Sequence, residues 1–70
     1  WETDVIASPA QIARAQALLS QLGYQPGPAD GMMGARTRSA IRDFRRSEGL
    51  TVSDRVDSTL LSRLEQAAAG

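Results

Sequence analysis

Apolar side chains recur along this chain at helical spacing, in three groups separated by segments rich in glycine, proline and charged residues. The first group advances in steps of three and four residues and consists of Ile12, Ala15, Leu18, Leu19 and Leu22. Ser8, Pro9 and Gln11 precede it in the order of a capping box, with the serine as N-cap. Gly23 follows it, and glycine readily takes the left-handed conformation that ends helices. The pattern therefore predicts a helix over residues 9–22.

The second and third groups predict two further helices. Residues 35–48 carry an inward-facing set, and Gly49 ends this helix as Gly23 ends the first; the set is Thr37, Ala40, Ile41 and Phe44. Leu50 and Val52 are expected to return to the core. Asp57 is placed to cap a third helix, whose apolar positions are Leu60, Leu61, Leu64 and Ala68.

The remaining segments define the organisation of the chain. Residues 24–34 contain two prolines and three glycines, which predicts an ordered loop with a turn at Asp30-Gly31. Residues 1–7 show no period and are interpreted as a linker or N-terminal arm, residues 8–66 as the domain and 67–70 as a C-terminal tail. When the chain is aligned with itself at an offset of 23 residues, the second helix and the loop before it show weak similarity to the third helix and its preceding loop. We therefore predict an all-α fold: a compact three-helix bundle with a weak internal loop-helix repeat.

Composition narrows the chemistry. The 70 residues include no cysteine and no histidine, so a disulfide framework, a thiolate metal site and the commonest general base are excluded. Eight arginines balance eight acidic residues at a formal net charge of zero, which disfavours nucleic-acid binding. No catalytic residues, metal site or cofactor are predicted. The usual base, the thiol and the usual metal ligands are missing, and a domain of this size has little room for a cleft that desolvates a carboxylate pair.

No apolar stretch reaches the roughly 20 residues needed to cross a bilayer, and no signal peptide is visible. The chain begins with Trp1 rather than methionine, so we expect it to be a fragment of a larger protein whose targeting information lies elsewhere. As a fragment it is expected to be monomeric and not to insert into a membrane.

The motifs around the second helix closely resemble the bacterial peptidoglycan-binding domain family. They are Leu18-Leu19 with Leu22-Gly23-Tyr24, Gly27-Pro28-Ala29-Asp30-Gly31-Met32-Met33-Gly34, Thr37 with Ala40-Ile41 and Phe44, and Gly49-Leu50. The similarity runs from about Pro9 to Glu65. It implies a three-helix, non-catalytic module that binds peptidoglycan outside the cytoplasm. Turn chemistry accounts for most of the motif, since Asp30 and Gly31 set a turn, Gly34 gives tight entry to the helix and the Thr37 hydroxyl bonds locally.

Two positions depart from the family pattern. Arg45 stands where the family usually has glutamine, and the second D-G-x-x-G-x-x-T motif has become residues 53–60, without either glycine. We expect the fold to survive because Asp57 caps the third helix instead. These departures leave a second function open, in which the same fold binds a protein partner and has lost the wall ligand. A third interpretation, a DNA reader, is disfavoured by the zero net charge.

The candidate ligand-binding residues lie mainly on the second helix and are Tyr24, Asp30, Arg36, Arg38, Arg42 and Arg45. The helix carries five arginines and two acidic residues, a local charge of +3. Arg38, Arg42, Arg45 and Arg46 share one face away from Ile41 and Phe44. Guanidinium groups suit the carboxylates of peptidoglycan stems, although a solvated charged face explains the same pattern. Tyr24 either stacks on the ligand or covers the edge of the core. Met32 and Met33 either form an exposed binding lip, or Met33 lies inside the core and Met32 is half-exposed.

The resemblance therefore implies a binding module that anchors a larger extracytoplasmic, periplasmic bacterial protein to peptidoglycan, through either its peptide stem or its glycan.

Overall fold

The computed structural model describes residues 8–70, and these form three helices with no strand among them. Helix α1 spans Pro9–Gln21, α2 spans Ala35–Ser47 and α3 spans Ser58–Ala69. The all-α, three-helix prediction is confirmed. The arm predicted for residues 1–7 lies outside the described part of the chain.

The helix ends follow the local signals in the sequence. Ser8 and Gln11 form the predicted capping box, with Ser8 Oγ accepting the Gln11 N–H at 3.3 Å. Asp57 caps α3 by accepting the Leu60 N–H at 2.9 Å. Helix α3 continues to Ala69, past the tail boundary predicted at residue 67, because Ala67 and Ala68 pack against the core.

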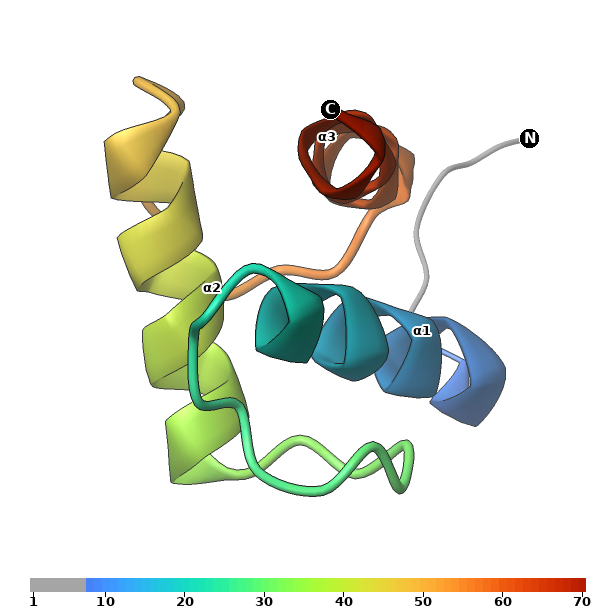
Figure 1. Ribbon diagram of the computed structural model, residues 1–70. Helices are drawn as coiled ribbons and strands as arrows, with labels where there is room; N and C mark the ends of the chain where they lie inside the picture. The colour runs from blue at the N-terminus through green and yellow to red at the C-terminus, as the bar shows by residue number, and fades with distance from the viewer. Residues whose placement is uncertain (1–7) are drawn as a thin grey trace, which may run out of the picture.

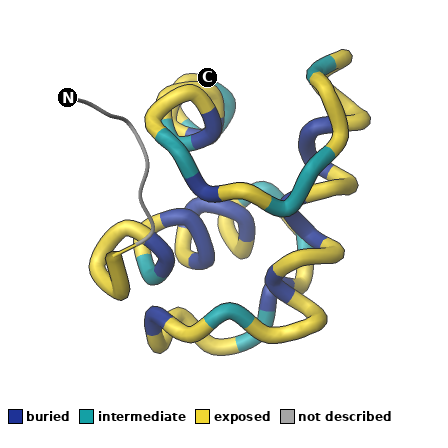
Figure 2. The backbone as a smooth tube through the Cα atoms, turned by 180° about the vertical axis from the view of Figure 1, so that it is seen from behind, coloured by how far each residue is buried: buried dark blue, intermediate teal, exposed yellow. Residues whose placement is uncertain are grey.

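Helix α1 packs against both of the other helices and lies across α2 (Figure 1). The buried positions of each helix face this common centre, while the outward turns are exposed (Figure 2). The core consists of Ile12, Ala15, Leu18, Leu19, Ala40, Ile41, Phe44, Val56, Leu60 and Leu64. Nearly all of these are the predicted stripe residues, so the helical periodicity identified the core correctly. Within residues 8–70, no helix has the length and apolar character of a membrane span.

The segment between α2 and α3 departs from the prediction. Val52 is 44 % exposed and Leu50 only half-buried, whereas Val56 is 4 % exposed and belongs to the core. The segment curls around the guanidinium of Arg45, which binds Ser53 Oγ at 3.0 Å and the Arg55 carbonyl at 2.7 Å. This path turns Val52 outward and brings Val56 inward.

The loop between α1 and α2 is fastened by a buried polar residue of α1. The Gln16 amide donates to the Met32 carbonyl and to Thr37 Oγ1, both at 2.9 Å, and accepts the Gly31 N–H at 3.0 Å. The Thr37 hydroxyl in turn donates to the Pro26 carbonyl at 2.7 Å. The predicted local bond of Thr37 is therefore one part of a network that joins α1, the loop and α2.

Candidate functional site

Tyr24 reaches its position because α1 ends in a glycine turn. Gly23 has φ +95°, and the Tyr24 N–H donates to the Leu19 carbonyl at 3.0 Å. The turn places the tyrosine ring beside α2, edge-to-face with Phe44 at 6.1 Å between ring centroids and 87° between planes. Tyr24 is half-buried, so one side of its ring covers the core and the rest borders solvent.

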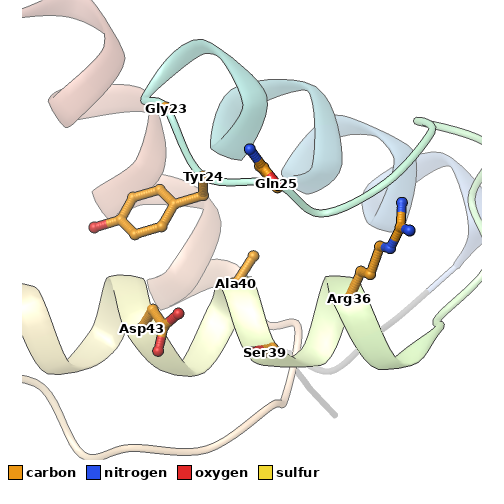
Figure 3. Close-up of a pocket in the computed structure, with 7 residues that line it drawn as sticks. All are labelled: Gly23, Tyr24, Gln25, Arg36, Ser39, Ala40 and Asp43. Atoms are coloured by element: carbon orange, nitrogen blue, oxygen red, sulfur yellow. The ribbon is translucent and has the colours of Figure 1, made fainter.

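An open groove of about 410 Å³ lies between this turn and α2 (Figure 3). Gly23, Tyr24 and Gln25 line one side, and α2 contributes Arg36, Ser39, Ala40 and Asp43. The four α2 residues recur at helical spacing and therefore share one face. The small side chains of Ser39 and Ala40 lie between the two charged residues along the helix.

The two charged residues of the groove differ in their partners. Asp43 Oδ1 lies 3.3 Å from Arg46 Nη1, and both side chains are more than half exposed. Arg36 forms no ion pair with any residue in the described range 8–70. Its side chain passes Gly27, where an added Cβ would lie 3.9 Å from Arg36 Cδ. The groove thus presents a guanidinium without an ion-pair partner among residues 8–70 and a weakly paired carboxylate.

Of the six predicted ligand-binding residues, two line the groove, namely Tyr24 and Arg36. Arg38 and Arg42 lie on a different face of α2, with guanidinium nitrogens 3.9 and 3.8 Å from Asp54 Oδ2. Asp30 lies in the turn, where its Oδ1 accepts the Met32 N–H at 2.9 Å. This contact is the structural role expected of an aspartate before glycine.

The prediction that Arg45 belongs to an exposed arginine face is wrong. Arg45 is 7 % exposed, and its guanidinium bonds Ser53, the Arg55 carbonyl and Asp57, the last at 3.4 Å. On the helix Arg45 follows Ile41 by four residues, which places it at the edge of the core. The segment before α3 closes over that edge and buries the arginine, so Arg45 fastens α2 to the start of α3.

The two methionines also separate. Met32 is 71 % exposed, more than the half-exposed position predicted, and Met33, which was predicted to lie inside, is half-buried and packs against the core. Gly34, expected to permit tight entry into α2, is extended with φ −113°, and a Cβ added to it would meet open space. Neither its backbone conformation nor its surroundings therefore require glycine.

The predicted ligand-binding set lacks three polar residues of the groove, Gln25, Ser39 and Asp43. Ser39 and Asp43 continue the spacing of Arg36 and Ala40, which is the signal that was available. The spacing indicates a binding face only because Tyr24 lies beside that face, and the path of the chain after α1 determines where Tyr24 lies.

A second open cavity, also about 410 Å³, lies on α3 and is lined by Ser58, Thr59, Ser62, Arg63 and Gln66. Its arginine is paired with Glu48 at 3.5 Å, and no aromatic residue of the described range 8–70 borders it.

A small helical bundle with an open, polar groove beside an aromatic ring is a module suited to binding rather than to enclosed chemistry. Residues 8–64 match the family described as "Putative peptidoglycan binding domain", and the chain belongs to this family. Membership assigns these residues to a class of non-catalytic binding modules with peptidoglycan as the ligand of the class.

The chain is also similar to a curated protein, the localization factor PodJL of Caulobacter vibrioides, in strains NA1000 / CB15N and ATCC 19089 / CIP 103742 / CB 15. Identity is 43 % over 58 residues, which cover 83 % of this chain and 6 % of each relative. The chain therefore spans a small part of the length of these relatives. No solved structure matches it.

Proposed function

We propose that this module anchors a larger extracytoplasmic bacterial protein to peptidoglycan, and that the groove between Tyr24 and α2 is its wall-binding site. The observation that carries the proposal is the pairing of Tyr24 with Arg36 in one groove of a peptidoglycan-binding domain. An aromatic face and a guanidinium without an ion-pair partner among residues 8–70 suit a polymer of sugars and carboxylate-bearing peptides. A periplasmic location follows from this ligand.

Co-sedimentation with purified sacculi tests the proposal. We expect the 70-residue chain to sediment with sacculi, and Arg36→Gln to weaken binding about tenfold, the equivalent of about 1.4 kcal/mol. Tyr24→Leu keeps an apolar side chain against Phe44 but removes the ring, and should weaken binding as well. Circular dichroism establishes that each variant remains helical.

The matched control is Arg38→Gln combined with Arg42→Gln on the other face of α2. This double variant should bind sacculi like the unmodified chain. If it loses binding while Arg36→Gln does not, the site lies on the face beside Asp54. If the folded, unmodified chain does not sediment, wall anchoring is contradicted.

The competing function is a protein-interaction module on the same fold. One observation favours it: in the segment where the family's second motif has lost both glycines, a contact between Arg45 and Asp57 holds the chain in place. The similar protein PodJL is described as a localization factor, a role that protein contacts would also serve. If this alternative holds, the domain should bind a defined protein partner and should not sediment with sacculi.

A further inference from the structure

The groove carries opposite charges at its two ends. Arg36 and Asp43 are seven residues apart on α2, which separates their backbone positions by about 10 Å along the helix axis. Figure 3 shows Ala40 between them and the Tyr24 ring on the Asp43 side of the groove. The arrangement provides one cationic end, one anionic end and an uncharged stretch between.

Both charges are available to a ligand. Arg36 has no ion-pair partner among residues 8–70. The partner of Asp43 is Arg46, whose side chain is 68 % exposed, and exposed pairs of this kind contribute little to stability. A carboxylate also has lone pairs enough to accept from a second cation while keeping the first.

This pattern selects among the parts of a peptidoglycan polymer. An uncharged glycan gains nothing from a cation and an anion held at the two ends of the groove, and a polyanion is repelled by Asp43. A peptide with one free carboxylate and one free amino group satisfies both ends. The backbone positions of Arg36 and Asp43 are about 10 Å apart, and the Arg36 side chain extends away from Asp43 (Figure 3). Because an extended peptide advances about 3.3 Å per residue, its two charges should lie at least about three residues apart to match the groove.

We propose that the groove binds the peptide stem of peptidoglycan as a zwitterion, an inference that rests on the proposed wall-binding function. Arg36 binds a stem carboxylate through its guanidinium, and Asp43 binds a free stem amino group. The exposed part of the Tyr24 ring packs against the peptide beside its amino-group end, on the Asp43 side of the groove. Asp43, which the sequence analysis had not selected, thereby becomes a residue that determines specificity.

Calorimetric titration with soluble muropeptides released from the sacculi tests this assignment. Three probes are compared: unmodified muropeptides, muropeptides with acetylated amino groups, and muropeptides with amidated carboxyl groups. We expect each modification to weaken binding to the unmodified chain about tenfold. Arg36→Gln and Asp43→Asn should each produce a similar loss with the unmodified probe.

The decisive measurement is whether a substitution in the protein and a chemical modification of the muropeptide have additive effects on the binding affinity. Acetylation should have no further effect on Asp43→Asn, and amidation no further effect on Arg36→Gln, because each pair removes the same contact from opposite sides. The crossed combinations should be additive. Arg55→Gln and Asp54→Asn, which lie outside the groove, are the matched charge controls and should leave all affinities unchanged.

Two results would overturn the assignment. If acetylated muropeptides bind the unmodified chain as tightly as unmodified ones, Asp43 does not read an amino group. If stem-free glycan fragments bind as tightly as muropeptides, the ligand is the glycan, and the assignment fails while wall binding stands. If the folded, unmodified chain does not bind sacculi at all, the proposed function itself is contradicted.

Discussion

Gln16 fastens the loop before α2 through hydrogen bonds to Gly31 and Met32. It lies in α1 with 1 % exposure, and its amide bonds Gly31, Met32 and Thr37. A buried amide of this kind is stabilising only while its partners are present, because each buried group left without a bond carries a desolvation cost. Gln16 therefore couples the loop that bears Tyr24 to the helix that bears Arg36.

Replacing this amide with an apolar side chain of similar size tests that role. We expect Gln16→Leu to lower the free energy of unfolding by about 2–3 kcal/mol, because the buried Gly31 N–H and Thr37 hydroxyl lose a partner. Urea unfolding followed by circular dichroism measures the change. Gln21→Leu, at an exposed position of the same helix, is the control and should stay within about 0.5 kcal/mol. Equal effects of the two changes would show that the network contributes nothing specific.

Gln16 and Arg45 also mark where prediction from the sequence stopped. The capping signals at Ser8 and Asp57 were read correctly because each acts within four residues of its partner. The polar contacts of Gln16 and Arg45 join residues 8 to 21 positions apart, through segments whose path periodicity does not determine. The same limit explains why Val52 was placed in the core and Asp43 was missed at the groove.

At the scale of elements, the loop before α2 is anchored by a close approach to α1. Gly31 has φ +80°, and an added Cβ would lie 2.7 Å from the Pro9 carbonyl oxygen. Gly34, three residues later, is the N-cap of α2 with extended backbone, open space and no side-chain cap. The two motif glycines therefore have different physical roles.

The same substitution at these two glycines should have opposite effects. Gly31→Ser introduces both backbone strain and a clash, and we expect it to destabilise the fold by at least about 2 kcal/mol. Gly34→Ser supplies the missing N-cap oxygen and restricts the unfolded chain, so it should be neutral or stabilising by up to about 1 kcal/mol. Thermal unfolding distinguishes the two, since 1 kcal/mol corresponds to about 4–8 °C in Tm for a domain of this size. A clear loss of stability in Gly34→Ser would contradict this division of roles.

Across the whole molecule, the fold brings acidic side chains to most of the arginines that give the second helix its local charge of +3 in the sequence. Arg45 is buried against Asp57, Arg46 pairs with Asp43, and Arg38 and Arg42 both lie near Asp54. Asp54 and Asp57, which lie outside α2, thus offset much of this +3, in which Asp43 is already counted. The sequence correctly located positive charge on α2, but the fold leaves Arg36 as the arginine of that helix without an ion-pair partner among residues 8–70.

This charge distribution predicts how wall binding responds to salt. A chain of zero formal net charge that binds through one cation and one anion gains little from long-range attraction, which salt screens beyond about 10 Å at 0.1 M. Raising sodium chloride from about 0.05 to about 0.5 M should therefore lower affinity for sacculi by less than about threefold. Binding by a cationic surface that includes Arg38, Arg42 and Arg46 would instead weaken more than about tenfold, since several like charges would be screened together. Co-sedimentation across this range consequently separates the groove from the arginine face without changing a single residue.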